Sequence, residues 1–114
     1  MLRGRLYMLQ SDIYINNIWE LISRIERDLG KKFYFKKGNL FYDSTLMRLQ
    51  VIGENIKKLS KVEILKYPEV KWKIFIRFRD FVSHHYADVN CSALRKIISV
   101  EIPILKKAIM EMKK

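Results

Sequence analysis

One stretch of this 114-residue sequence, from Arg79 to Tyr86, concentrates the side chains that can do chemistry near neutral pH. It reads Arg-Asp-Phe-Val-Ser-His-His-Tyr and contains both histidines of the chain. Histidine can accept and donate a proton near pH 7, arginine can stabilise negative charge on a phosphate, and tyrosine offers a hydroxyl for hydrogen bonding or modification. The segment therefore suits acid–base chemistry at a phosphate. The alternative is a solvated helix end, where the arginine pairs with an acid and the histidines lie on the surface.

Helical geometry constrains how these side chains can cooperate. Asp80 and His84 are four residues apart and would face the same side of a helix, so the carboxylate could orient the imidazole and favour its protonated form. Arg79 is five residues from His84, which is about 140° around an ideal helix. Their convergence would need the long reach of arginine, a frayed helix end or a second protomer. A cleft between two protomers would meet this need.

The apolar pattern predicts the helices that position this segment. Over residues 6–29, apolar residues recur at three- and four-residue steps, which indicates a first helix that Gly30 ends. Asp43 is expected to cap a second helix over residues 44–60. Within that helix Gly53 costs about 1 kcal/mol relative to alanine, so we expect the backbone there to pack closely against a neighbour.

The second half of the chain shows similar signals. Pro68 suits a first helical turn, where its missing N–H costs nothing, so a third helical segment is expected from Pro68 to His85. Asp88 or Asn90 is expected to cap a last helix, which should be kinked at Pro103. Its apolar positions again recur at helical spacing as far as residue 112.

These elements predict an all-α, up-and-down bundle of roughly four or five helices with short connections. Residues 1–114 are expected to form a single domain, because the chain is long enough for one core but too short for two ordinary domains. Trp19, Trp72 and Phe75 could serve either the core or an interface between protomers.

The charge of the chain indicates a polyanionic partner. Its 23 Lys and Arg residues against 12 Asp and Glu give a formal net charge of +11, which would attract nucleic acid. A lysine-rich surface can also simply keep a protein soluble. The predicted loop at 31–39 interleaves aromatic residues with lysines that could contact a single strand: Lys31, Lys32, Lys36 and Lys37. Alternatively, Phe33 to Phe35 pack beneath a helix connection while these lysines face water.

Cysteine use and hydropathy indicate a cytoplasmic protein. Cys91 is the single cysteine, so no internal disulfide can form, and no Cys/His cluster has the spacing of a zinc site. The amino terminus has no apolar signal core, and charged residues interrupt every apolar run before it reaches membrane-spanning length. Neither export, nor membrane insertion, nor a bound metal is expected.

Four ordered segments resemble the HEPN toxin family. Residues 79–86 resemble its R-x-x-x-x-H-x-Y signature, and Val51-Ile52-Gly53-Glu54-Asn55 resembles its I-G-E-A segment. Residues 67–72, Tyr-Pro-Glu-Val-Lys-Trp, are similar to its Y-P-E-I-P-W segment, and residues 102–105, Ile-Pro-Ile-Leu, to its late L-P-x-L segment. The resemblance extends over about residues 6 to 112, nearly the whole chain.

The resemblance implies a homodimeric helical bundle in which the signature segments of two protomers face a shared cleft. It implies a metal-independent endoribonuclease without cofactor, the toxin of a type VII-like toxin–antitoxin pair whose antitoxin is a minimal nucleotidyltransferase. Arg79 would stabilise charge on the RNA phosphate, and His84 would act as the acid or base. Tyr86 takes the position at which such nucleotidyltransferases attach AMP.

Two positions depart from the family pattern. Asp80 stands where close relatives mostly have Asn, and a carboxylate there weakens attraction for phosphate. His85 follows His84 where many relatives have Glu or Gly, so His85 could support function when His84 is replaced. Two other functions therefore stay open: a non-catalytic partner of a nucleotidyltransferase, and a simple nucleic-acid-binding module.

Overall fold

A computed structural model describes residues 2–29 and 36–114, with the backbone alone described at residues 2–10 and 29. The described residues form helices and connecting turns without a β-strand. In order, the α-helices are α1 (Leu2–Leu29), α2 (Leu40–Lys57), α3 (Lys61–Leu65), α4 (Trp72–His85), α5 (Cys91–Lys96) and α6 (Ile102–Lys113). The prediction of an all-α fold is confirmed.

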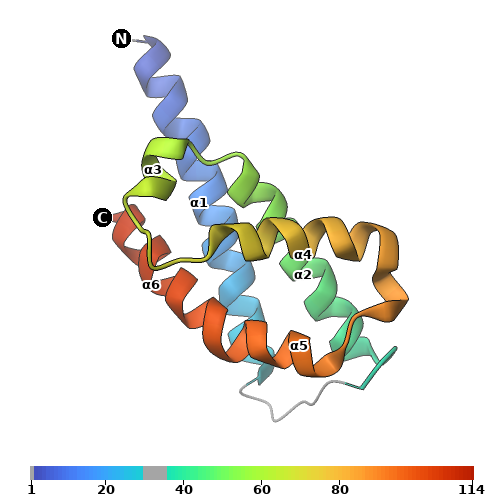
Figure 1. Ribbon diagram of the computed structural model, residues 1–114. Helices are drawn as coiled ribbons and strands as arrows, with labels where there is room; N and C mark the ends of the chain where they lie inside the picture. The colour runs from blue at the N-terminus through green and yellow to red at the C-terminus, as the bar shows by residue number, and fades with distance from the viewer. Residues whose placement is uncertain (1, 30–35) are drawn as a thin grey trace.

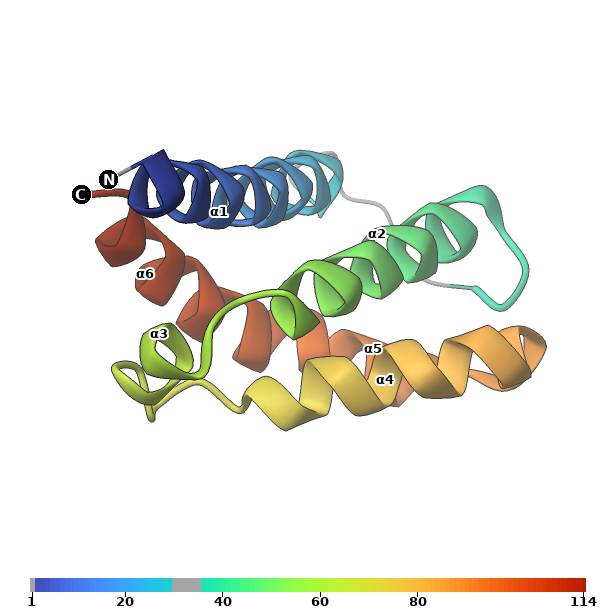
Figure 2. The ribbon, with the colours of Figure 1, turned by 90° about the horizontal axis from the view of Figure 1, so that it is seen from above.

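Helix α2 lies between two other helices. It packs against α1 on one side and against α4 on the other, and Figure 2 shows it between them. Both neighbours run in the opposite direction to α2, as an up-and-down bundle requires (Figure 2). Helix α6 packs against α1. No helix within the described ranges has the length and apolarity needed to cross a membrane.

The core follows the apolar periodicity of the sequence. The apolar stripe of α2 is buried at Leu46, Leu49, Ile52 and Ile56. Helix α1 contributes a row of buried isoleucines at three- and four-residue steps, which are Ile15, Ile18, Ile22 and Ile25. Ile13 is 54% exposed, whereas Ile15 is buried. Among the aromatic residues, Trp72 and Phe75 belong to the core. Trp19 is half-buried on α1, with the ammonium groups of Lys106 and Lys113 over its ring.

The predicted start of the second helix is wrong. Helix α2 begins at Leu40, and Asn39 rather than Asp43 caps it, accepting a hydrogen bond from the backbone N–H of Tyr42 at 2.7 Å. Gly38, at φ +82°, supplies the turn that leads into this cap. Asp43 therefore lies within the first helical turn, where its side chain can reach another element.

The prediction that Pro68 begins a helix is also wrong. Ser60 caps the short helix α3, and its hydroxyl bonds reciprocally with Glu63. Pro68 then lies in a turn closed by a bond from the N–H of Val70 to the carbonyl of Tyr67. Helix α4 begins at Trp72, whose indole N–H donates to the same Tyr67 carbonyl.

The last helical stretch is interrupted rather than continuous. Asn90 caps α5 by accepting hydrogen bonds from the N–H groups of Ser92 and Ala93, which confirms one of the two predicted caps. A π-helical segment, Ile97–Glu101, joins α5 to α6 just before Pro103. The chain changes direction there in Figure 1. Proline lacks the N–H that would continue the α-helical ladder, so an irregularity at this point is expected.

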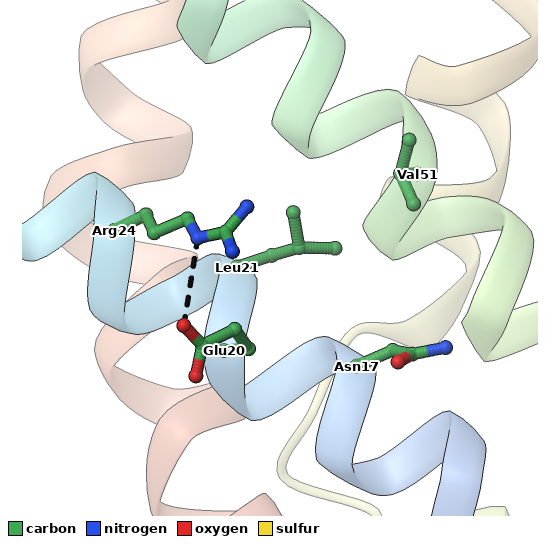
Figure 3. A pocket seen from close by; sticks show the side chains of 5 residues that line it. All are labelled: Asn17, Glu20, Leu21, Arg24 and Val51. Atoms are coloured by element: carbon green, nitrogen blue, oxygen red, sulfur yellow. Dashed lines mark ion pairs between the residues drawn. The ribbon is translucent and has the colours of Figure 1, made fainter.

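A pocket of about 310 Å³ lies where α1 and α2 face each other on their outer side. Figure 3 shows its lining residues, which are Asn17, Glu20, Leu21, Arg24 and Val51. Glu20 and Arg24 form an ion pair at 3.5 Å along one face of α1, and both side chains are largely exposed.

Candidate active site

Arg79 lies on the side of α4 that otherwise builds the core. The buried residues of this helix are Trp72, Phe75 and Val82, and Arg79 falls between the last two at helical spacing. Its side chain is 30% exposed. A charged group in an apolar stripe is costly unless it is paired, so a partner for the guanidinium is expected nearby.

Gly53 makes room for Arg79. A Cβ at position 53 would lie 2.7 Å from the Cβ of Arg79 and 2.7 Å from the carbonyl oxygen of Phe75. Such distances are too short, so only glycine lets the two helix backbones approach this closely. The close packing predicted at Gly53 is confirmed, and it fixes the base of the arginine side chain.

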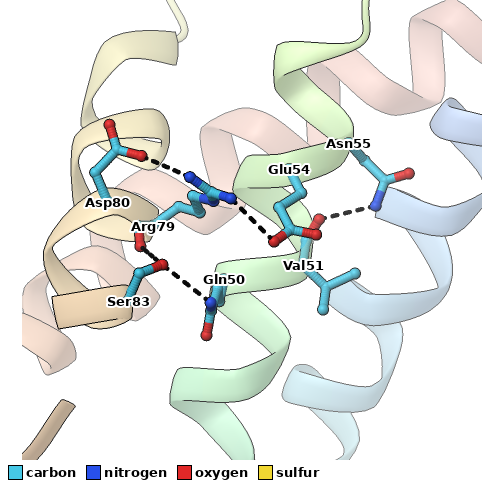
Figure 4. A network of polar contacts seen from close by, with 7 residues as sticks. All are labelled: Gln50, Val51, Glu54, Asn55, Arg79, Asp80 and Ser83. Atoms are coloured by element: carbon cyan, nitrogen blue, oxygen red, sulfur yellow. Dashed lines mark hydrogen bonds and ion pairs between the residues drawn. The ribbon is translucent and has the colours of Figure 1, made fainter.

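Two carboxylates hold the guanidinium of Arg79. One terminal nitrogen donates to Asp80 at 2.9 Å, and the other donates to Glu54 of α2 at 3.4 Å (Figure 4). The hydrogen bond with Asp80, followed by that with Glu54, raises the pKa of Arg79. The guanidinium is therefore charged and fixed in position, but the two carboxylates offset its charge.

Asp80 is directed toward Arg79. Its carboxylate accepts the arginine hydrogen bond, and no hydrogen bond joins it to His84 among the described residues. This bond lowers the pKa of Asp80, and the charges of Lys57, Arg79 and His84 lower it further. The expected orientation of His84 by Asp80 is therefore absent from this arrangement of the side chains.

The histidines lie at the exposed end of α4. The helix continues regularly to His85, so His84 remains about 140° around the axis from Arg79. His84 is exposed, and no hydrogen bond links its side chain to another described residue. The ring of His85 packs on Phe81 with centroids 4.9 Å apart. A single chain thus does not bring Arg79 and His84 together.

Tyr86 turns back toward α2. The α-helix ends at His85, and Tyr86 begins a 3₁₀ turn, Tyr86–Asp88. The buried hydroxyl of Tyr42 donates to the carbonyls of Tyr86 and Val89, at 3.2 and 3.0 Å, and thereby anchors this turn. The phenol of Tyr86 is 46% exposed. Hydrogen bonding to the carboxylate of Asp43, with burial second, raises the pKa of Tyr86 to about 12.

Polar residues thus form a line between the antiparallel helices, which we call the α2–α4 seam. Its α2 members are Asp43, Gln50 and Glu54. Facing them are Tyr86 of the 3₁₀ turn and Ser83 and Arg79 of α4. The amide of Gln50 donates to Ser83 at 3.2 Å, and the hydroxyl of Ser83 donates to the carbonyl of Arg79 at 3.0 Å (Figure 4).

On the α2 side of this seam, Gln50 and Glu54 were not among the predicted site residues, and Asp43 was predicted only as a helix cap. A signal was present, because residues 43, 50, 54 and 57 are polar or charged and recur at seven, four and three residues. This is helical spacing, and it lies next to the unusual Gly53. A polar stripe beside a helix-interior glycine indicated that α2 faces a charged partner.

Arg79 lines a pocket of about 380 Å³ together with Glu54, Lys57 and Lys58. The ammonium group of Lys58 lies 5.4 Å from the ring centroid of Tyr14. Lys57 is exposed and forms no ion pair within the described part of the chain. The pocket therefore combines a fixed guanidinium with an ammonium group that is available to an anion.

The predicted lysine loop is only partly described. Lys31 and Lys32, like Gly30 and Phe33 to Phe35, lie outside the described residues. Lys36 and Lys37 are exposed and precede α2 at the end that carries Asp43. In the described ranges, no group of three or more His, Cys, Asp or Glu side chains could hold a metal ion.

Comparison with known families identifies what the chain resembles. The model of the family described as "Ribonuclease HepT-like" matches residues 15–112. A protein named as probable ribonuclease HepT from Thermococcus cleftensis is 30% identical over 105 residues, which cover 89% of this chain and 94% of that protein. A candidate RNase from Caldanaerobacter subterraneus is 35% identical over 88 residues, covering 76% of this chain and 79% of that protein.

Other relatives are matched over only part of their length. A Methanocaldococcus jannaschii protein, named as a gamma-glutamylcyclotransferase and candidate RNase, is 31% identical over 102 residues, or 87% of this chain. The chain spans 46% of that relative and 57% of a second candidate RNase from the same organism, so about half the length of each. No solved structure is significantly similar to the chain.

Proposed function

The chain belongs to the HepT-like ribonuclease family, and from this premise we propose that it is a metal-independent endoribonuclease toxin neutralised by a minimal nucleotidyltransferase. The proposal rests on the positions of the side chains of the signature segment on α4. It presents a fixed, partly exposed guanidinium at Arg79 and an exposed imidazole at His84. Together these can serve charge stabilisation and proton transfer.

In the proposed reaction, His84 removes the proton of a ribose 2′-hydroxyl or protonates the leaving 5′-oxygen. Arg79 stabilises the additional negative charge that develops on the phosphate in the transition state. Each step uses side chains of the protein alone. RNA would have to displace at least one of the two carboxylates, Glu54 or Asp80, that hold the guanidinium in the free protein.

A homodimer with a shared cleft would complete this site. Arg79 and His84 diverge by about 140° on one helix, so Arg79 of one protomer and the partner's His84 would act on one phosphate. Two-fold symmetry would then create two equivalent sites. The high positive charge of the chain would draw RNA to the cleft.

Tyr86 is the proposed acceptor of AMP. Its hydroxyl oxygen would attack the α-phosphate of ATP bound to the partner nucleotidyltransferase, with release of pyrophosphate. Exposure of Tyr86 supports access by that partner. The attached phosphodiester would lie two residues from His84 and would repel RNA. Mass spectrometry of wild type and Tyr86→Phe after incubation with partner and ATP tests this step, and unchanged mass in the wild type would contradict it.

The test of the ribonuclease is cleavage of total RNA by purified protein in the presence of EDTA. We expect His84→Ala to lower the rate about a hundredfold or more, as for loss of a general acid or base. His85→Ala is the matched control, because its ring packs on Phe81, and it should retain most activity. Intact RNA with wild type would refute the proposal.

The composite site has a sharper test. Arg79→Ala and His84→Ala proteins, each inactive alone, are mixed under conditions of subunit exchange. Random pairing gives half mixed dimers with one complete site of two, so about one quarter of wild-type activity should return. A site contained in one protomer would give no recovery.

A second candidate function is a non-catalytic companion of a nucleotidyltransferase. The ion pairs that offset the charge of Arg79 favour it, since a guanidinium occupied by Asp80 attracts phosphate less. If this candidate is correct, the wild-type protein leaves RNA intact, and the His84→Ala protein still forms a complex with the nucleotidyltransferase. Cleavage gained in Asp80→Asn alone would show that Asp80 silences the site.

A further inference from the structure

The pocket beside Arg79 is lined by residues of α2 that have no role in the signature segment or in the family match. Its lining comprises Lys57, Lys58 and Arg79 against the single acid Glu54. The three cationic residues come from two different helices, since the lysines stand at the end of α2 and the arginine on α4. The pocket therefore has a net positive lining where the two helices meet.

Lys57 and Lys58 are not equivalent within this pocket. The ammonium of Lys58 lies over the ring of Tyr14 at 5.4 Å from the centroid, a cation–π contact that engages its charge with α1. Lys57 is exposed and is close enough to Asp80 for its charge to lower the pKa of that carboxyl. Lys57 thus lies beside the Arg79–Asp80 pair with its ammonium group available.

Displacement of Asp80 from Arg79 by a phosphate would leave that carboxylate without its hydrogen-bond donor. Lys57, the exposed cation near Asp80, is then placed to contact the incoming strand. The volume of about 380 Å³ is ample for a phosphate group with part of its ribose. Because the pocket shares Arg79 with the cleavage site, a strand bound at Arg79 would extend into it.

We propose that the pocket formed by Lys57, Lys58, Glu54 and Arg79 binds a backbone phosphate of the RNA strand next to the one that is cleaved, with Lys57 as its cation. This inference rests on the proposed ribonuclease function and adds a substrate-binding residue to it. Lys57 contacts a phosphate that does not react, so it contributes to substrate binding rather than to the chemical step.

The experiment measures kcat and KM for a single-stranded RNA at several salt concentrations. Lys57→Ala should raise KM about three- to fivefold and reduce the slope of log KM against log salt by about 0.7, the loss of one phosphate contact. Its kcat should stay within about twofold of wild type. Lys57→Arg should restore KM, since it keeps the charge.

The matched control is Lys107→Ala. It removes the same charge from an exposed position on α6, a helix that packs on α1. If Lys57→Ala and Lys107→Ala change KM and the salt slope equally, the pocket has no role and the inference is overturned, while RNA cleavage by wild type leaves the proposed function standing.

A wild type that does not cleave RNA would contradict the proposed function instead. The pocket is then judged by fluorescence anisotropy with a labelled RNA oligonucleotide. Weaker binding by Lys57→Ala than by Lys107→Ala supports the pocket, and equal binding by both overturns it. Thermal melting of each variant verifies that the fold is intact.

Discussion

Two pockets of this protein contain an arginine and a glutamate, yet the pairs are built differently. In the pocket between α1 and α2, Glu20 and Arg24 lie four residues apart on one helix and are 60% and 48% exposed (Figure 3). In the pocket at the α2–α4 seam, Glu54 reaches Arg79 from a different helix, and the arginine is 30% exposed (Figure 4). The volumes are similar, about 310 and 380 Å³.

The difference shows how tertiary packing turns a common ion pair into a positioned group. The Glu20–Arg24 pair is local and solvated, so it contributes little to stability. In contrast, the Cβ of Arg79 packs closely against the backbone at Gly53, and ion pairs with Glu54 and Asp80 hold its guanidinium. A guanidinium fixed before substrate arrives can stabilise a transition state without the cost of reorganisation.

The largest effect expected from this comparison concerns the two arginines. Arg79→Ala should lower the rate of RNA cleavage about a hundredfold or more, as loss of a transition-state donor does. Arg24→Ala removes the same charge from the other pocket and should leave the rate within about twofold. Single-turnover cleavage of a labelled RNA measures both. Equal losses would mean that overall charge, and not position, matters.

A smaller effect is expected from closing the space that Gly53 leaves. Gly53→Ala places a methyl group 2.7 Å from the Phe75 carbonyl and the Arg79 Cβ. Overpacking should lower the free energy of unfolding by about 1–2 kcal/mol, after the gain in helix propensity is subtracted. Urea denaturation measures it, with Met47→Ala as control because Met47 on α2 is 63% exposed. A more stable Gly53→Ala protein would contradict the close approach of α2 and α4.

The smallest effect concerns the other end of the seam. Because Asp43 raises the pKa of Tyr86 to about 12, the neutral phenol is favoured in the folded state. Its contribution to stability is present below pH 10 and is lost as the pH rises toward 12. Burial also raises the pKa of Tyr42, so ultraviolet titration should show late-ionising tyrosines, of which Tyr86→Phe removes one. In Asp43→Asn the ionisation of Tyr86 should move to lower pH.

The control for this titration is Asp12→Asn, which changes an exposed carboxylate on α1. It should leave the late ionisation where it is in the wild type. If Asp12→Asn and Asp43→Asn have the same effect, the pKa of Tyr86 reflects general charge instead of its contact across the seam.

Local signals located the elements but misplaced two of their starts. Asn39 follows a lysine- and aromatic-rich stretch that is typical of a loop, so the sequence favours Asp43 as the cap, whereas Asn39 is the cap in the structure. Pro68 suits the first turn of a helix, yet it lies in the turn between α3 and α4, and α4 begins only at Trp72. Several residues in each region could satisfy a cap, and the choice between them depends on which side chains the core buries.

The sequence alone determined the helical class, the apolar stripes and the close contact at Gly53, and it placed both histidines in one segment with Arg79 and Tyr86. All of these depend on spacing along the chain, which a sequence records directly. The tertiary structure decided which groups meet. It paired Arg79 with Glu54 and Asp80, set Asp43 close enough to Tyr86 to raise the pKa of its phenol, and set Lys57 beside Arg79. These contacts depend on the register between α2 and α4, and that register comes from packing across helices distant in sequence.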